Sequence, residues 1–336
     1  MPKGRKEEEK MNATMKVHLE TIKFGENQVH NHVAVIPLLS ENGAGPDYLT
    51  LKEAMEGHLI TITELTEGGS VPELKVKNTG TRPVLLLDGE EVSGAKQNRV
   101  LNTTILVKEC SETVIPVSCT EQGRWSYRSA HFQESGHMMS AHLRRVKNES
   151  VAYCLRSSQR YDSDQGAVWE GIRNQSEAAD IESPTGAMRD IHEAKKEDLD
   201  AYLEHFTLVP GQKGILVLVG GKVAGMDMLS RSEAFRVIYP KLIKSYIMDA
   251  ILEKQGKAKA NPLETAQAFM ADILECQEQK YDSVGYGTDY RYEGGKIVGS
   301  ALIHEDTVIH MAFFRITQAE MAGSMAGPSR RRGFRR

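Results

Sequence analysis

Short apolar runs separated by turn-forming residues dominate the chain from about residue 16 to about residue 125. The separating clusters are rich in Gly, Pro, Asn and Asp, as in Asn78–Pro83. The runs recur at intervals of roughly ten residues, which is typical of antiparallel sheets packed as a sandwich. We therefore predict strands at the following segments: 16–22, 33–39, 59–65, 74–76, 84–87, 103–107 and 113–117.

Helical periodicity replaces this pattern in the second half of the chain. Ser163 or Asp164 is placed to cap a helix that runs through Trp169. Apolar residues between Leu199 and Phe206 recur at helical spacing. The second half is therefore predicted to be rich in helix.

Two further helices carry recognisable start signals. Ser230–Glu233 has the form of a capping box, and we expect Pro240 to kink or split the helix that it opens. Asn261 followed by Pro262 predicts the first turn of another helix. Strands are predicted again at three segments: 213–219, 297–303 and 307–314.

A six-residue pattern, G-x-x-[VI]-x-G, occurs at Gly89–Gly94, Gly220–Gly225 and Gly294–Gly299. We interpret the three copies as tight hairpin turns, since the first Gly can take positive φ. Duplication of an ancestral unit is the alternative interpretation. The predicted fold is α+β, with a β-rich N-terminal half of sandwich-like antiparallel sheets, a helix-rich second half and a C-terminal β-hairpin.

The two ends of the chain differ in composition from its body. Residues 1–15 are predicted to form a charged, disordered head, and residues 319–336 a flexible tail with five Arg in its last seven residues, 330–336. Between them we expect one large α+β domain over 16–318, β-rich over 16–125 and mixed over 126–318. The basic tail is suited to contact RNA or another acidic partner.

Composition narrows the class of protein. Of 336 residues, 40% are hydrophobic and 26% charged, which excludes a chain that is disordered over most of its length. No apolar run is long enough for a membrane span, and none behind the N-terminus resembles a signal peptide, so a cytoplasmic protein without membrane contact is expected. A net charge of −4 gives no reason for nucleic-acid binding over the whole surface. The four cysteines lack metal-binding spacing and are expected to be reduced.

The densest polar stretch follows the apolar run 84–87. Lys96 and Arg99 offer donors suited to phosphate or carboxylate. Gln97, Asn98 and Asn102 can pair with ribose hydroxyls or with a base edge. The alternative is an exposed hairpin whose charges pair with one another.

Two carboxylates, Glu90 and Glu91, open the same stretch. In a continuing strand they point to opposite faces, so only one is expected to face a site. That one can act as a general base or hold Mg²⁺. For metals other than Mg²⁺, the sequence predicts no ligand residue.

Two other segments are candidates for ligand contact. Glu121, Gln122 and Trp125 follow an apolar strand, where Trp125 either stacks on a ring or closes one end of the core. In the second segment a helix start can approach an anion, although a plain helix cap explains it equally. Its residues are Asp164, Gln165 and Trp169.

Several of these motifs together resemble a known family. The stretch LLLDGEEVSGAKQNRVLNTTILV, followed by IPVSCTEQGRW, DQGAVW, SPTGAM, VGGKVAGMD, YPKLIKSYIMDA and SVGYGTD, is similar to the ADP-ribosylglycohydrolase- and rhodanese-phosphatase-associated protein domain. The similarity runs from about Val33 to Phe314. It implies a link to NAD-derived or ADP-ribosyl metabolism and names no reaction. Through the resemblance, the candidate residues named above are expected to be site residues of the family. They belong to three motifs: the stretch from Glu90 to Asn102, the segment from Glu121 to Trp125 and the helix start from Asp164 to Trp169.

Two hypotheses follow. In the first, the three motifs converge on one pocket that binds, and in an enzyme hydrolyses or transfers, a phosphorylated ribose-containing molecule of the ADP-ribose or NAD type. Lys96 and Arg99 would hold phosphate, Gln97 and Asn98 hydroxyls, and Trp125 a ring. In the second, the protein is a non-catalytic, homo-oligomeric adaptor whose Arg-rich tail contacts RNA or another acidic partner. The sequence does not decide whether the protein is an enzyme or a binding module.

Overall fold

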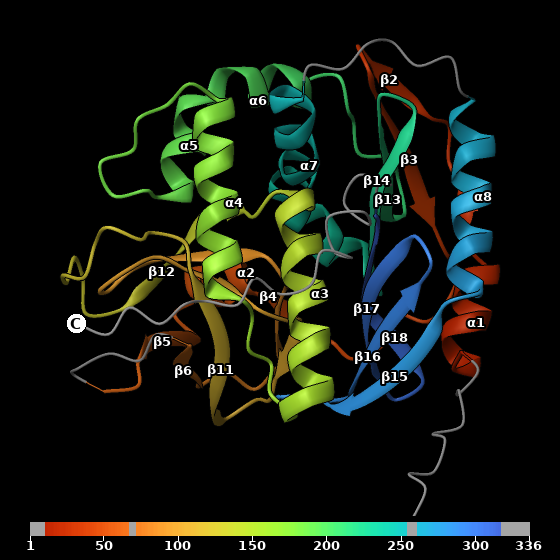
Figure 1. Ribbon diagram of the computed structural model, residues 1–336. Coiled ribbons are helices and arrows are strands. Elements are labelled where there is room, and N and C mark those ends of the chain that lie inside the picture. Colours follow the sequence, from red (N-terminus) through yellow and green to blue (C-terminus); the bar gives the residue numbers. More distant parts are fainter. Residues whose placement is uncertain (1–10, 67–71, 254–260, 317–336) are drawn as a thin grey trace, which may run out of the picture.

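The computed structural model describes residues 11–66, 72–253 and 261–316. A large antiparallel sheet divides the molecule, with two helices on one face and the other helices and a second β-rich region on the opposite face (Figure 1). The β-rich N-terminal half and the strands near the C-terminus confirm the predicted α+β class.

The large sheet combines strands from both ends of the described chain. Its order is β1-β3-β13-β14-β18-β17-β16-β15, and β2 also pairs with β3. The first five strands of that order are β1 (Lys23–Phe24), β3 (Val33–Leu39), β13 (Gln212–Val219), β14 (Lys222–Leu229) and β18 (Thr307–Arg315). The remaining strands are β17 (Ile297–His304), β16 (Thr288–Gly294), β15 (Gln277–Asp282) and β2 (Gln28–His30).

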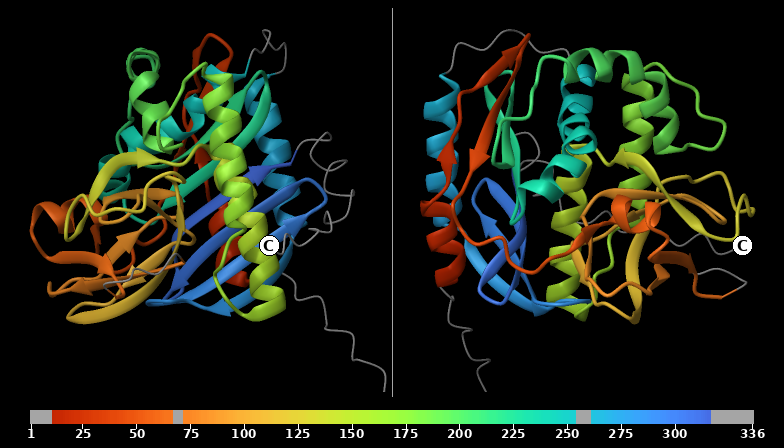
Figure 2. Two further views of the ribbon diagram at one scale, coloured as in Figure 1. Left: turned by 60° about the vertical axis from the view of Figure 1, so that its left-hand side comes forward. Right: turned by 180° about the vertical axis from the view of Figure 1, so that it is seen from behind.

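Each face of this sheet is covered by helices. On one face α1 (Ala13–Glu20) and α8 (Pro262–Leu274) pack over a core that includes Leu216, Phe269 and Phe313 (Figure 2). On the other face lie α3 (Ala141–Ser158) and α7 (Ser232–Leu252), whose apolar residues join the largest core cluster. The helices α4 (Gln165–Ala178), α5 (Met188–Ala194) and α6 (Lys196–Leu203) extend this layer.

The second β-rich region is built from residues 49–138 and has its own core. A six-stranded antiparallel sheet has the order β12-β8-β9-β11-β6-β5, and a three-stranded sheet has the order β10-β7-β4. The strands of the first are β5 (Ile60–Glu64), β6 (Glu73–Asn78), β8 (Glu90–Gly94), β9 (Arg99–Leu101), β11 (Ser111–Cys119) and β12 (Phe132–Met138). Those of the second are β4 (Leu49–Thr50), β7 (Val84–Leu86) and β10 (Ile105–Val107), and α2 (Leu51–Glu56) packs beside them.

The prediction of a strand at 16–22 is wrong, because residues 13–20 form α1. Asn12 caps this helix by accepting a hydrogen bond from the Met15 amide at 3.3 Å. Its buried residues are Met15, His18 and Leu19, a spacing of three and four that matches a helix and not a strand. The charged head was predicted to extend to residue 15. Residues 1–10 of it, like the Arg-rich tail, lie outside the described residues, whereas Met15 is fully buried.

The helix predicted from Ser230–Glu233 exists but starts differently. The α7 helix has Arg231 at its N-cap without a side-chain cap, because the Ser230 hydroxyl lies 3.0 Å from the Tyr48 hydroxyl instead. The helix is not split at Pro240. It is buried between the large sheet and the second β-rich region, and tertiary packing of this kind outweighs the local cost of one proline.

Two of the three repeated glycine patterns are hairpins. Gly220–Gly225 joins β13 to β14 and Gly294–Gly299 joins β16 to β17, as predicted. Gly89–Gly94 is not a hairpin, since β7 belongs to the three-stranded sheet and β8 to the six-stranded one. Gly89 makes this transfer with φ of +87°, and a Cβ there would meet Arg144 Cδ at 2.7 Å.

None of the helices in the described part of the chain combines the length and the hydropathy that a membrane span requires.

Candidate functional site

The turn between β8 and β9 meets the segment that follows β11. The Thr120 amide donates to the Asn98 carbonyl at 3.1 Å, and the Arg128 amide donates to the Ala95 carbonyl at 2.9 Å. Two of the three motifs singled out in the sequence are therefore side by side. Gly94, with φ of +128°, allows the close approach, because a Cβ there would meet Ser129 Oγ at 2.6 Å.

Arg124 is the buried connection between the two segments. Its guanidinium donates to the Ala95 carbonyl at 2.8 Å and to Asn98 Oδ1 at 3.2 Å, and it forms an ion pair with Glu121 at 2.7 Å. Glu121 also accepts a hydrogen bond from the Thr185 hydroxyl at 3.0 Å. Burial alone would raise the pKa of Glu121, but the hydrogen bond and charge of Arg124 hold it below its ordinary value. Glu121 is therefore ionised, and its contacts with Arg124 and Thr185 fix the segment that follows β11.

In the same two segments, a cation lies over two exposed aromatic rings. Lys96 Nζ is 5.3 Å from the Trp125 ring centre and 5.1 Å from that of Tyr127. Trp125 is 49% exposed and Tyr127 is 52% exposed. We call these three residues the Lys96 surface. Exposed aromatic rings beside a cation suit a ligand that has both a planar ring and negative charge.

Arg99 lies behind the Trp125 ring, with its Cζ 5.8 Å from the ring centre and no exposed surface. Nη1 donates to Gln97 Oε1 at 3.1 Å and to the Asn98 carbonyl at 3.4 Å. Nη2 lies 3.7 Å from Glu64 Oε1 on β5. Burial lowers the pKa of Arg99 below its ordinary value. The structure therefore distinguishes Arg99, which is fully buried, from Lys96, which is only half-buried.

The two adjacent carboxylates of β8 have different surroundings. Glu90 accepts a hydrogen bond from the Leu87 amide at 2.6 Å and forms an ion pair with Lys241 at 2.5 Å. Glu91 is completely buried and accepts a hydrogen bond from the Thr120 hydroxyl at 2.6 Å. Burial raises the pKa of Glu91 to about 7. Glu91 can therefore exchange a proton near neutral pH.

The third motif starts α4 next to the end of β11. Gln165 accepts from the Cys119 amide at 2.7 Å and donates to the Cys119 carbonyl at 2.9 Å. Asp164 is exposed and caps the helix through the amides of Gly166 and Ala167. Trp169 is half-buried. In this motif Asp164 therefore caps the helix, and Gln165 joins the helix to the end of β11.

Two more candidate residues complete the set. Asn102 donates to the Tyr161 carbonyl at 3.0 Å and accepts from the Ser118 hydroxyl at 2.7 Å, so its amide is engaged inside the protein. Gln122 is exposed next to Glu121. Gln122 is therefore open to solvent, whereas Asn102 is not.

Comparison with known proteins places the chain in a family. The model of the ARG and Rhodanese-Phosphatase-superfamily-associated Protein domain matches residues 21–314. The chain belongs to this family. A search of curated proteins and a search of solved structures each found no significant match. Both segments of the Lys96 surface lie within the stretch that the family model covers.

The family stretch also contains a buried charge cluster that the sequence pattern did not reveal. Asp227 on β14 accepts from Arg144 Nη1 at 2.9 Å, from Arg144 Nη2 at 2.6 Å and from the Tyr246 hydroxyl at 2.5 Å. Lys147 forms an ion pair with Asp88, which follows β7. The pairing of these charged side chains is visible only in the structure, because the paired residues come from segments that are distant in the sequence. Tyr127 was likewise missed, because an aromatic residue in a polar loop carries no signal of a neighbouring cation.

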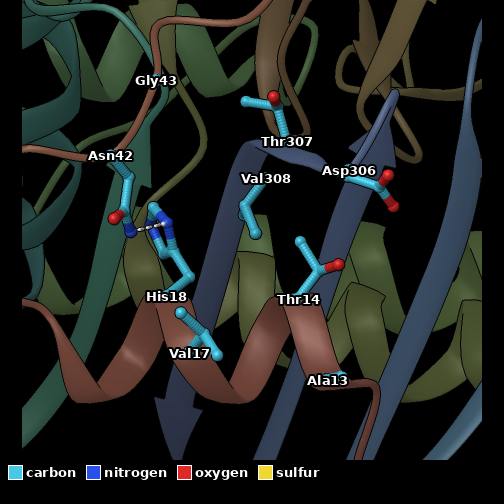
Figure 3. A pocket seen from close by; sticks show the side chains of 9 residues that line it. All are labelled: Ala13, Thr14, Val17, His18, Asn42, Gly43, Asp306, Thr307 and Val308. Atoms are coloured by element: carbon cyan, nitrogen blue, oxygen red, sulfur yellow. Dashed lines mark hydrogen bonds between the residues drawn. The ribbon is translucent and has the colours of Figure 1, made fainter.

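A groove outside these motifs lies between α1, the chain around Asn42 and the β17–β18 turn (Figure 3). Its volume is about 440 Å³, and His18 is its buried polar residue. The Asn42 amide nitrogen lies 2.9 Å from His18 Nδ1. Burial, and secondarily the charge of Lys213, lower the pKa of His18 to about 4, so that the ring is neutral. The groove shares no lining residue with the Lys96 surface.

In the described part of the chain, no cluster of three or more His, Cys, Asp or Glu side chains is arranged to hold a metal ion.

Proposed function

We propose that the Lys96 surface binds a phosphorylated, base-containing ligand of the ADP-ribose class. The observation that carries the proposal is the Lys96 ammonium over the exposed rings of Trp125 and Tyr127. A planar base stacks on such rings with little sequence or ring preference. The family's description, which names an association with ARG proteins, supports the choice of ligand class.

The phosphates of the ligand would lie against Lys96 and Arg128. Arg128 is 60% exposed, and its guanidinium is 3.9 Å from Glu121, which keeps it beside the surface. Lys96 is half-buried and Arg128 is exposed, and the two cations lie where the β8–β9 turn meets the segment after β11. They attract a diphosphate mainly by charge, so binding should weaken as salt concentration rises. The rigid base formed by Arg124 and Glu121 would hold the rings in place before the ligand arrives.

Cleavage of the ligand is a separate part of the proposal and depends on Glu91. In a hydrolysis, water would attack the ribosyl or phosphoryl centre while Glu91 takes the proton of that water, the bond to the leaving group would break, and the proton would pass from Glu91 to the leaving group. A carboxyl with a pKa of about 7 can both accept and give a proton at neutral pH. Glu90 is less suited, since Lys241 neutralises it and the Leu87 amide fixes it. In this scheme Thr120, whose hydroxyl bonds Glu91, connects the carboxyl to the Glu121 segment.

Calorimetric titration with ADP-ribose tests the binding proposal. Trp125→Ala should weaken binding by roughly tenfold or more, since stacking of a base contributes about 1–3 kcal/mol. Lys96→Ala should weaken binding and reduce its salt dependence. The matched control is Lys108→Ala, because Lys108 Nζ lies 5.1 Å from the Tyr286 ring outside this surface. Folded Lys96 and Trp125 variants that bind ADP-ribose as the wild type does would exclude the proposal.

A further inference from the structure

A buried ion pair with open hydrogen-bonding capacity lies directly behind the Lys96 surface. Glu64 Oε1 and Arg99 Nη2 are 3.7 Å apart, which is too long for a hydrogen bond. Within the described residues, both carboxylate oxygens of Glu64 and the Nε and Nη2 atoms of Arg99 have no hydrogen-bond partner. The side chain of Glu64 is 4% exposed and that of Arg99 is 0% exposed. Buried charges normally have their remaining hydrogen-bond positions satisfied.

The neighbouring amides do not supply these partners. Gln97 Oε1 already accepts from Arg99, and Asn98 Oδ1 accepts from Arg124 and from the Gly94 amide at 3.3 Å. The open positions are therefore two acceptors on Glu64 and two donors on Arg99. A group that donates and accepts at once would match both. A water molecule does so, and among the groups of a ligand a hydroxyl does so.

We infer that Glu64 and Arg99 recognise the vicinal hydroxyls of a ribose in the ligand of the proposed function, on which this inference rests. A carboxylate has two oxygens and accepts from both hydroxyls of a 2′,3′-diol, while the guanidinium donates back to the same oxygens. The pair lies next to the ring on which the base stacks, since Arg99 Cζ is 5.8 Å from the Trp125 centre. Base and ribose are neighbours in every nucleotide, so the two contacts belong to one ligand.

Entry of a ribose requires Trp125 to move, because Arg99 has no exposed surface and the Trp125 ring lies beside its guanidinium. The segment after Glu121 has no helix or strand up to residue 131, and such a segment can shift without breaking a sheet. The chain has two tryptophans, Trp125 and Trp169. In the variant Trp169→Phe, tryptophan fluorescence therefore reports Trp125 alone, and it should change when the ligand binds.

The first test uses the wild-type protein and three probes. ADP-ribose and ADP differ by the terminal ribose, and ADP and 2′,3′-dideoxy-ADP differ by the diol of the adenosine. Loss of the diol that is recognised should weaken binding by roughly tenfold or more, as expected when a buried charged group loses its hydrogen bonds. The loss is expected between ADP and 2′,3′-dideoxy-ADP, because the ribose of the inference is the one attached to the stacked base. A loss between ADP-ribose and ADP alone would overturn the inference. Equal affinity within both pairs would overturn the inference and leave the proposed base and phosphate contacts standing.

The second test uses Glu64→Gln, with Glu134→Gln as the matched control. Glu134 also pairs with a buried cation, Lys241, at 2.7 Å, but it is outside the surface. Glu64→Gln should reduce the discrimination between the paired probes to roughly threefold or less, whereas Glu134→Gln should leave it unchanged. A less stable Glu64→Gln protein that still discriminates fully would show an ion pair satisfied by water alone and would overturn the inference. Failure of ADP-ribose to bind the wild-type protein would overturn both this inference and the proposed function.

Discussion

At the scale of single residues, Glu91 gives the clearest dependence on pH. Burial raises the pKa of Glu91 from 4.5 to about 7, so the folded protein holds this proton more tightly than the unfolded chain does. The stability associated with the protonated carboxyl is therefore fully present below about pH 4.5 and is lost as the pH rises through about 7. The difference in pKa corresponds to roughly 3 kcal/mol. Glu91→Gln, which cannot ionise, should gain stability relative to the wild type by up to this amount between about pH 5 and pH 8.

Denaturant unfolding of both proteins at the two pH values measures this difference. Asp249 also has a pKa raised by burial, to about 6, but it is common to both proteins and cancels in the comparison. Glu112→Gln serves as a control, since the Glu112 side chain is 54% exposed and forms an ion pair with Lys77 at 3.4 Å. Parallel pH curves for the wild type and Glu91→Gln would show that this carboxyl does not carry the expected proton.

At the scale of elements, patterns of apolar residues predicted many of the strands and the late helices, but missed two elements in which charged side chains occupy core positions. The strands at 33–39 and 307–314 and the helix after Asn261 were predicted because their buried positions are apolar. β9 and α3 were missed because Arg99, Arg144 and Lys147 occupy core positions. Their partners come from distant segments, so no local pattern shows that these side chains are buried. The meeting of the Lys96 and Trp125 segments likewise depends on tertiary structure.

The α8 helix provides a prediction at the same scale. Asn261 caps it by accepting a hydrogen bond from the Leu263 amide at 3.1 Å. The helix buries Phe269 and Ile273 against the large sheet, so its first turn contributes to the stability of the whole protein. Asn261→Ala should lower the free energy of unfolding by about 1 kcal/mol, while Asn261→Asp should retain most of it. Thermal unfolding of the two variants measures the effect, and an equal loss in both would rule out capping as its cause.

At the scale of the whole molecule, the buried charge cluster joins the two β-rich regions through α3. Arg144 and Lys147 on this helix pair with Asp227 of the large sheet and with Asp88 of the second β-rich region. Burial alone would raise the pKa of Asp227, but the charge and hydrogen bonds of Arg144 and the hydrogen bond from His310 hold it at about 2. Asp227 therefore remains ionised at every pH at which the protein is expected to fold. The cluster fixes the position of one region against the other.

Removal of one charge from this cluster should therefore destabilise the entire fold in one step. Asp227→Asn leaves Arg144 buried without its main counter-charge, and breaking a buried pair in this way costs roughly 3–5 kcal/mol. The matched exposed carboxylate is Asp47, which is 60% exposed and forms ion pairs with Arg82 at 3.2 Å and with Arg231. Asp47→Asn should cost no more than about 1 kcal/mol. If the cluster couples the two regions, circular dichroism and tryptophan fluorescence will report one coincident unfolding transition for Asp227→Asn at a lower denaturant concentration. Two separate transitions would mean that the regions fold independently and that the cluster does not join them.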